Sequence, residues 1–396
     1  MLTVEEAIGK LVSSAVSPSD SKTISLIDSL GHILSEDIVP ALDVPPENNS
    51  AMDGYAFCYA DAAAKNFRLP VRLRIPAGVA PPTLAKNSVA RIFTGAEMPL
   101  GADTVALQED CQEQDGEVML DKTINSGANV RLKGQDIRSE RPLLPVGTII
   151  RAQEMGLLSS IGKSRISVFK PIKIGVLSTG NELVEPGNPL SRGQIYNSNR
   201  ALLIGLISSM GMEPVDLGIA EDSLAVTADL LKKAAERTDI IICCGGVSVG
   251  DEDYVKRAVD EVGCIDFWRV AIKPGKPIAF GAIANVPFFG LPGNPASVFV
   301  TFKILVRPFL LVSQGCTDIG PTVISARAEF DKKAEDREVY LRARLSKDAT
   351  GVEIFSNQSS GILSSACWGD VFVRQKIGET INTGNSVDVI PYSFLN

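Results

Sequence analysis

The pattern of apolar and polar positions changes several times along this chain. Between residues 171 and 310, an apolar run stops three times at a short glycine-containing loop and then gives way to helix-forming sequence. Each passage predicts a buried strand, a tight turn and the start of a helix. The passages are IKIGVLSTGNEL (172–183), DIIICCGGVSVGDEDY (239–254) and PFFGLPGNPASVFVTF (287–302). This alternation predicts a three-layer α/β domain over 171–315 with a mostly parallel sheet.

The remaining sequence predicts three further domains. TVEE at 3–6 is a capping box that opens a helix, and a second helix is expected over ISLIDSLGHILS (24–35). Residues 138–170 are mixed sequence with a helix over AQEMGLLSSIG, so 1–42 and 138–170 are expected to form one discontinuous helical or mixed domain. Short β-like stretches broken by Pro, Gly and Asn predict a small β-rich domain over 43–137. The pattern over 316–396 predicts a C-terminal β sandwich or barrel.

Composition excludes several classes of function. A net charge of −8 argues against broad nucleic-acid binding, because phosphate neutralisation needs a basic surface. The apolar runs are broken before they reach bilayer-spanning length, and MLTVEEAIGK lacks the basic and apolar regions of a secretory signal. A length of 396 residues suggests two to four domains. A cytoplasmic protein without nucleic-acid or membrane partners is expected.

Cysteine and histidine usage narrows the chemistry. The seven cysteines are scattered without a CxxC pair, which is typical of buried thiols in a reducing compartment. Cys243 and Cys244 should point to opposite faces of their strand. The single histidine, His32, is expected on a helix surface, which argues against His-rich zinc sites and a Ser-His-Asp triad. Any metal is therefore expected to have oxygen ligands, which points towards magnesium.

The three loops should meet at the carboxyl edge of the sheet, where open α/β sheets bind ligands and helix N-termini favour anions. Glycines let backbone N–H groups approach a ligand, and hydroxyls add donors. Carboxylates there would repel an anion unless a cation bridges them, so the set predicts a polyanion such as a polyphosphate, bound with Mg²⁺. Ordinary βα turns are the alternative. The loops carry Ser178, Thr179, Gly180, Asn181, Glu182, Gly245, Gly246, Ser248, Gly250, Asp251, Asp253, Pro292, Gly293, Asn294 and Pro295.

Other polar segments add candidates. IKPGKP places Lys273 and Lys276 on a restricted backbone where they could neutralise an oxyanion, although a solvated turn would look the same. NNSAMDGYA surrounds Asp53 with small and polar residues, which on the residues alone favours a simple Asx or Ser turn. Thr94 follows a short strand in RIFTGAEMPLGAD, and Asp136 lies in the charged loop RLKGQDIRSE.

Taken together, these segments resemble the molybdopterin molybdenumtransferase family of the MoeA type, which also occurs as the E domain of gephyrin-like proteins. The resemblance spans essentially the whole chain. The motifs that carry it, in order, are NSAMDGYA, TGA…P.GAD, GQDI, STGNEL, GQIYNSN, GGVSVGD.D, IKPGKP and LPGNPAS. Asn48, Glu140 and Asn181 depart from residues common in that family, where an acidic residue, a Gly and an Asp respectively are usual.

The resemblance implies an elongated homodimer of four-domain subunits, in which the small β-rich domain of one copy completes the cleft of the other. It also implies a transferase in molybdenum cofactor biosynthesis. Such enzymes take adenylylated molybdopterin and molybdate, cleave off AMP in a Mg²⁺-dependent step, and insert molybdenum into the dithiolene. Expected partners are these small molecules, a second copy, the adenylyltransferase that makes the substrate, and the recipient molybdoenzymes.

Site roles are likewise implied by the resemblance. Glu182, Asp253 and Asp136 are expected to position Mg²⁺ and the attacking water, and Lys273, Lys276 and Arg342 are expected to hold molybdate. The glycine loops are expected to hold the terminal phosphate and the pterin. The other positions that match functional residues of the family are Asp53, Thr94, Asp222, Arg269, Pro292, Pro295 and Ser365.

Three rival functions remain open from sequence alone. The related adenylyltransferases lack the NSAMDGYA region and the C-terminal β domain. A non-catalytic scaffold of the gephyrin E-domain kind would not need the acids and lysines found here. A generic nucleotide-binding α/β protein is weakened by the absence of a P-loop or GxGxxG motif.

Overall fold

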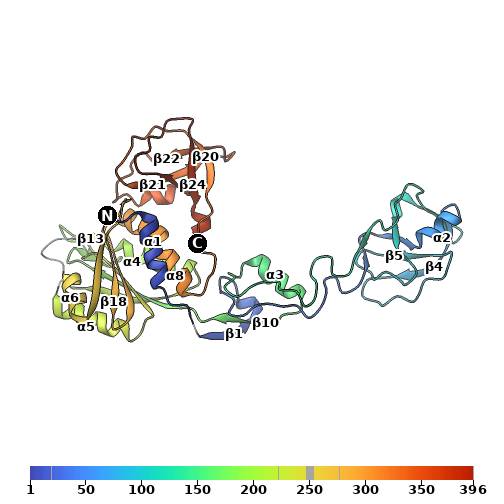
Figure 1. Cartoon of the computed structure of the whole chain (residues 1–396), viewed down its shortest axis with the longest axis horizontal. Helices are drawn as coiled ribbons and strands as arrows, with labels where there is room; N and C mark the ends of the chain where they lie inside the picture. Colours follow the sequence, from blue (N-terminus) through green and yellow to red (C-terminus); the bar gives the residue numbers. More distant parts are fainter. Residues whose placement is uncertain (19, 222, 247–253, 276, 396) are drawn as a thin grey trace.

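The computed structural model describes residues 1–18, 20–221, 223–246, 254–275 and 277–395. Figure 1 shows an elongated molecule. The α/β domain and a C-terminal barrel lie together at one end, the small β-rich domain lies at the other, and a mixed domain containing β1, β10 and α3 connects them. The multidomain α/β architecture expected from the sequence is confirmed.

The α/β domain contains a six-stranded sheet in the order β14-β11-β15-β19-β18-β16. The pairings among β14, β11, β15 and β19 are parallel, and β18 and β16 add antiparallel pairings at one side. The three strands that carry the glycine loops are therefore neighbours, as predicted. The strands are β11 (Lys173–Thr179), β14 (Glu213–Ala220), β15 (Ile240–Cys244), β16 (Gly263–Arg269), β18 (Pro277–Ile283) and β19 (Val286–Leu291).

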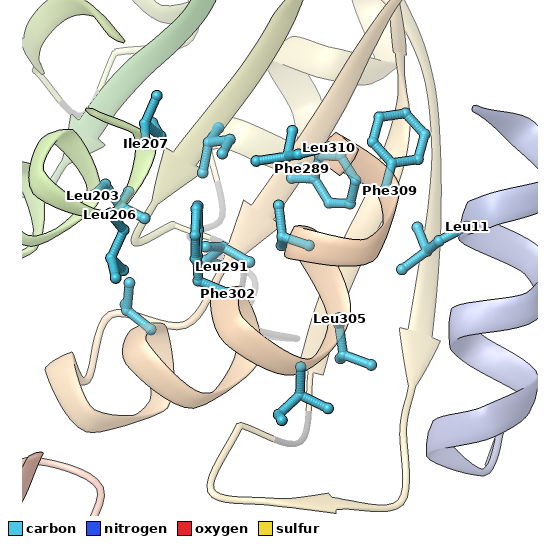
Figure 2. Packing of buried hydrophobic residues seen from close by; sticks show 14 of the residues in the cluster. Leu11, Leu203, Leu206, Ile207, Phe289, Leu291, Phe302, Leu305, Phe309 and Leu310 are labelled. Atoms are coloured by element: carbon cyan, nitrogen blue, oxygen red, sulfur yellow. The ribbon is translucent and has the colours of Figure 1, made fainter. Parts of the chain in front are cut away.

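Helices cover both faces of this sheet. One face carries a large apolar core that includes Phe289 and Phe309, whose ring centroids are 5.0 Å apart (Figure 2). A smaller core lies on the opposite face. Cys244 belongs to the first core and Cys243 to the second, which confirms their predicted opposite orientations. The helices are α4 (Ser198–Ser209), α5 (Leu224–Ala235), α6 (Tyr254–Val262), α7 (Pro295–Thr301), the π-helical η3 (Phe302–Val306) and α8 (Arg307–Ser313).

The segment Pro295–Ser313 is long and apolar enough to cross a membrane by length and composition. This differs from the expectation that no such run exists. Its most apolar window is 94% buried inside the protein, and its residues contribute to the larger core of the α/β domain. The packing of this core accounts for the apolarity of the helix, since a core helix passes the same test of composition.

The first passage does not lead directly into a helix after STGNEL, although the helix expected over NRALLIGLISSMG (199–211) forms as α4. The chain instead forms the short parallel pair β12 (Leu183–Val184) and β13 (Ile195–Tyr196), and α4 begins only at Ser198. Pro186 and Pro189 interrupt the intervening stretch, which prevents a helix from continuing there. Asn197 caps α4 by accepting a hydrogen bond from the backbone N–H of Arg200 at 3.3 Å.

The capping box at the N-terminus is confirmed. The N–H of Glu6 donates to Thr3 Oγ1 at 3.1 Å, and the N–H of Thr3 donates to Glu6 Oε2 at 2.8 Å. The resulting helix, α1 (Val4–Ser14), buries its apolar side in the larger core of the α/β domain and lies against α8. Residues 1–14 therefore pack with 171–315, which differs from the expected domain division.

The helix predicted over 24–35 is also wrong. Strand β1 (Ser21–Ser25) pairs with β10 (Arg165–Phe169), and the 3₁₀ turn η1 (Leu26–Asp28) follows. Ile24 packs against a separate core in which Leu34 and Val168 also lie, so the pairing of β1 with the distant strand β10 buries part of this stretch without a helix. His32 is half-buried outside any helix, and this burial lowers its pKa. The helix expected over 152–162 forms as α3 (Ala152–Ser160).

The small domain is β-rich, as expected. Its main sheet has the order β6-β3-β5-β4-β8-β7, and a second pair joins β2 to β9. Its elements are β2 (Asn49–Ser50), β3 (Gly54–Phe57), α2 (Tyr59–Ala64), β4 (Arg68–Ile75), β5 (Val89–Ile92), β6 (Thr104–Leu107), η2 (Gln108–Asp110), β7 (Gln112–Gln114), β8 (Glu117–Met119) and β9 (Val130–Arg131).

The C-terminal domain resolves the two predicted alternatives in favour of a barrel. Its sheet runs β17-β21-β22-β20-β24-β23, and pairing of β21 with β23 closes it. The strand β17 comes from the IKPGKP segment, which links the barrel to the α/β domain. The elements are β17 (Ile272–Lys273), β20 (Ile324–Ala328), β21 (Glu338–Leu345), β22 (Gly351–Ile354), α9 (Ser364–Trp368), β23 (Val371–Gln375), β24 (Ser386–Pro391) and η4 (Tyr392–Leu395).

Candidate functional site

A cavity of about 630 Å³ lies where the carboxyl edge of the sheet faces the C-terminal barrel. One wall comes from the loops after β11, β15 and β19 and from the IKPGKP segment, and the other comes from the barrel. The structure therefore brings together much of the predicted set. The predicted residues that line the cavity are Thr179, Gly180, Glu182, Gly245, Gly246, Lys273, Pro292, Gly293 and Asn294.

Glycine is required where the first two loops meet. Gly245 has φ +88°, and a Cβ added there would lie 2.6 Å from the carbonyl oxygen of Thr179. Gly246 has φ +60°, and its Cβ would lie 2.8 Å from Thr179 Oγ1. Both positions combine a left-handed backbone with a close approach, which disfavours a side chain. These glycines therefore let the loops close into one surface.

The hydroxyl of Thr179 is a candidate ligand-binding group. Its Oγ1 is buried in the wall of the cavity and has no hydrogen-bond partner among the described residues. A buried polar atom without a partner costs free energy that a ligand can recover. The neighbouring Ser178 points elsewhere: it is buried and its Oγ donates to Asn197 Oδ1 at 3.3 Å, so it supports the loop from behind.

Glu182 is the acidic group of the cavity among the residues described. Its carboxylate is exposed and folds back over Gly180, where an added Cβ would collide with it. Within the described ranges, no three His, Cys, Asp or Glu side chains gather in a metal-binding group. Mg²⁺ often binds through one or two carboxylates together with substrate phosphates, so Glu182 fits a substrate-assisted magnesium site.

The other two predicted metal ligands do not join Glu182 here. Asp253 lies outside the described residues. Asp136 lines a separate hollow of about 280 Å³ formed by residues 134–138 and 141–143. Glu140, in the turn between these two stretches, has φ +62°, and this left-handed backbone accounts for the Gly that is usual at its position in the family. The predicted set of three metal ligands stays a prediction.

Lys273 faces the cavity and forms a two-pronged ion pair. Its Nζ donates to both carboxylate oxygens of Glu335, at 2.8 and 2.9 Å. Lys332 donates to Oε1 of the same carboxylate at 2.7 Å. Hydrogen bonds from these two lysines lower the pKa of Glu335 from 4.5 to about 2. Glu335 was not predicted from sequence, because its partner lies 62 residues earlier in the chain.

The Glu335 ion pairs should stabilise the fold only above acidic pH. A carboxyl whose pKa falls on folding contributes stability above its unfolded pKa, and this is lost as pH drops from about 4.5 towards 2. We expect Glu335→Gln to lower the free energy of unfolding by about 1 kcal/mol at pH 7, since the pair is partly exposed. Urea unfolding at pH 7 and pH 3 should show this difference shrinking at the lower pH. An equal difference at both pH values would contradict this assignment.

The barrel wall contains residues that the sequence analysis missed. Arg337, Gln358, Ser359 and Ser360 line the cavity, and the carbonyl of Ser360 accepts the N–H of Ala296 at 2.9 Å. This contact satisfies the start of α7, where Asn294 occupies the cap position without a side-chain capping bond and Pro295 is the first helical residue. The small polar run SNQSSG at 356–361 was the available sequence signal.

Arg342 and Ser365 lie behind this wall instead of lining the cavity. Arg342 is only 1% exposed; its Nε donates to Ser365 Oγ at 3.0 Å and its Nη2 donates to the carbonyl of Ser359 at 3.1 Å. Burial lowers the pKa of Arg342. In this arrangement both residues fix the loop that forms the wall, and the expected contact of Arg342 with molybdate stays a prediction.

Two other predicted residues lie in the small β-rich domain. Thr94 donates to Asp53 Oδ1 through both its N–H and its hydroxyl, each at 2.7 Å, and these bonds lower the pKa of Asp53. This domain lies at the far end of the chain from the cavity (Figure 1). Arg269 is exposed and does not line the cavity. The remaining predicted residues, Asp222, Ser248, Gly250, Asp253 and Lys276, lie outside the described residues.

Family models match nearly the whole chain. Residues 2–162 match the MoeA N-terminal region (domain I and II), 175–312 match a probable molybdopterin binding domain, and 326–392 match the MoeA C-terminal region (domain IV).

Full-length relatives agree. The molybdopterin molybdenumtransferase of Haemophilus influenzae is 34% identical, with 100% of both chains covered. That of Nostoc sp. is 35% identical, with 97% of this chain and 91% of the relative covered. A solved molybdopterin biosynthesis MoeA protein from Pyrococcus horikoshii gives a TM-score of 0.84 at 26% identity, covering 99% of this chain and 100% of the other. A second MoeA structure from this organism gives a TM-score of 0.77 at 32% identity, covering 99% of each chain. The chain therefore belongs to the molybdopterin molybdenumtransferase (MoeA) family.

Proposed function

We propose that this protein inserts molybdenum from molybdate into adenylylated molybdopterin and releases AMP in a Mg²⁺-dependent step. The observation that carries this proposal is the composition of the cavity wall. Glycine loops, the carboxylate of Glu182, the ammonium of Lys273 and the hydroxyl of Thr179, which has no partner among the described residues, converge there. This set suits a phosphorylated ligand and an oxyanion held side by side.

Different groups of the chain suit different parts of the substrates, according to their charge. The glycine loops at Gly246 and Gly293 and the hydroxyl of Thr179 line the cavity and are placed to hold phosphate and pterin groups. Lys273 and Arg337 supply positive charge for molybdate. Glu182 would hold Mg²⁺ together with the substrate phosphate, and the ion would neutralise charge that develops when the phosphoanhydride is cleaved. Asp253 and Asp136 remain proposed as further ligands on the strength of the family resemblance.

We propose that the working unit is a homodimer in which Asp53 and Thr94 of one copy approach the cavity of the other. Within one chain these residues lie far from the cavity (Figure 1). The hydrogen bonds from Thr94 lower the pKa of Asp53 and so favour its carboxylate form, which can bind a cation or accept a further hydrogen bond. Analytical ultracentrifugation should give a dimer, and a monomer at working concentration would count against the shared site.

The proposed reaction can be tested with purified components. Incubation with adenylylated molybdopterin, molybdate and Mg²⁺ should yield AMP and a cofactor that activates an apo-molybdoenzyme. Omitting Mg²⁺ or adding a chelator should stop both products. A protein that consumes ATP with bare molybdopterin would instead be an adenylyltransferase. A protein that forms no cofactor but retains a stoichiometric protein partner would be a scaffold.

We also propose a cytoplasmic location. The seven cysteines, all within the part of the chain that the structure describes, form no disulfide there, and several are buried, which suits a reducing compartment. Fractionation of cells that express the tagged protein would test this.

A further inference from the structure

The ion pairs of Lys273 have an arrangement that simple anion binding does not require. Lys273 lines the cavity, whereas Glu335 and Lys332 do not. The side chains of Lys273, Glu335 and Lys332 are 40%, 19% and 25% exposed, so the carboxylate is the most sheltered of the three. Glu335 thus lies outside the cavity lining and pairs with the ammonium of Lys273, so an anion that enters the cavity must compete with this carboxylate.

Lys332 is fixed in place independently of the cavity. Its backbone N–H donates to the carbonyl of Ile381 at 2.8 Å, and the N–H of Ile381 donates back at 2.9 Å. This bridge belongs to the barrel and does not involve the α/β domain. The ammonium of Lys332 can therefore stay on Glu335 whatever happens to Lys273.

The energetic consequence follows from burial. An incoming oxyanion competes with Glu335 for the ammonium of Lys273. If Glu335 lost its only cation, a partly sheltered carboxylate would be left without a compensating charge, which disfavours the release of Lys273. Because Lys332 donates to the same carboxylate, the release of Lys273 leaves Glu335 still paired.

We propose that Glu335 and Lys332 are positioning residues that allow the ammonium of Lys273 to exchange its partner, from the carboxylate of Glu335 to an incoming oxyanion. Glu335 orients Lys273 while the cavity is empty, and Lys332 keeps Glu335 compensated when Lys273 turns to a tetrahedral oxyanion such as molybdate. This proposal rests on the proposed function for the identity of the oxyanion.

If this exchange occurs, the effect of replacing Lys332 on molybdate binding should depend on whether the carboxylate of Glu335 is present. Lys332→Met should trap Lys273 on Glu335 and weaken molybdate binding about tenfold. In a Glu335→Gln background there is no carboxylate to trap Lys273, so adding Lys332→Met should change binding less than twofold. Lys332→Arg should restore wild-type binding, because its guanidinium can also pair with Glu335. If Lys332 acted only through its positive charge at a distance, its replacement would weaken molybdate binding equally in the wild-type and the Glu335→Gln backgrounds.

The measurement is calorimetric titration of the full-length protein with molybdate, done for the wild type, each single variant and the double variant. The KM for molybdate should follow the same pattern while kcat stays within twofold. An equal effect of Lys332→Met in both backgrounds, or an effect below twofold in the wild-type background, would overturn the exchange. If Lys332→Met does not fold, Lys332→Gln replaces it. If the variants show this pattern of molybdate binding but the wild type forms no cofactor, the result would contradict the proposed function and still support the exchange.

Discussion

Replacing Glu182 with Gln is expected to lower the rate of molybdenum insertion by about 10²–10³-fold, equivalent to roughly 3–4 kcal/mol of transition-state stabilisation. Glu182 is the carboxylate that the described part of the chain presents to the cavity. The amide keeps the shape of the side chain but removes the charge that would hold Mg²⁺ and orient the leaving phosphate. Release of AMP and formation of active cofactor should fall together in a reconstituted assay.

The matched control for this variant is Glu213→Gln. Glu213 begins β14 at the opposite edge of the same sheet, where it is exposed and lies 3.9 Å from Lys173. Its replacement should leave the rate unchanged. Since Glu182 is exposed, both variants should also keep the fold and the oligomeric state of the parent. Wild-type turnover by Glu182→Gln would refute the catalytic assignment.

The second large effect concerns Arg342. Arg342→Met is expected to lower the free energy of unfolding by about 2–4 kcal/mol, because it removes two hydrogen bonds from a buried guanidinium, one to the carbonyl of Ser359 and one to the buried hydroxyl of Ser365. The loop carrying Gln358, Ser359 and Ser360 should then loosen, and the KM for molybdate should rise. Chemical denaturation and steady-state kinetics would measure the two effects.

Arg344→Met provides the comparison, since Arg344 lies two positions along the same strand but is exposed. Its guanidinium carbon lies 4.4 Å from the centre of the Trp368 ring, outside the cavity. We expect its loss to cost less than about 1 kcal/mol. If Arg342→Met kept wild-type stability and still raised the KM, Arg342 would have to contact molybdate directly, as the family resemblance first implied.

The sheet edge was predictable from sequence because its signal is local. Each strand, glycine turn and helix start lies within about a dozen residues, and parallel strands must present their carboxyl ends at one edge. The order of strands and loops along the chain was therefore enough to predict that Thr179, Gly245 and Gly293 lie together. No helix starts directly after the first loop for an equally local reason, because Pro186 and Pro189 favour the short β12–β13 pair before α4 begins.

The barrel wall was not predictable, because it depends on contacts between distant segments. Glu335 meets Lys273 across 62 residues, and Arg342 meets Ser365 across 23. The amphipathic pattern of a helix such as α1 predicts that one face will be buried, but it does not identify the domain against which that face packs. Asp53 and Thr94 were singled out by motif alone, since nothing within one chain places them beside the cavity.

The division of the site between two copies is tested most directly by mixing two inactive variants. Asp53→Ala removes the acid of the small domain, and Glu182→Gln removes the acid of the cavity. Each variant alone should be inactive in cofactor formation. Dimers that contain one chain of each variant pair an intact small domain with an intact cavity at one of their two sites, so the mixture should regain up to about a quarter of wild-type activity after random reassortment. No recovery in verified mixed dimers would contradict a site shared between chains.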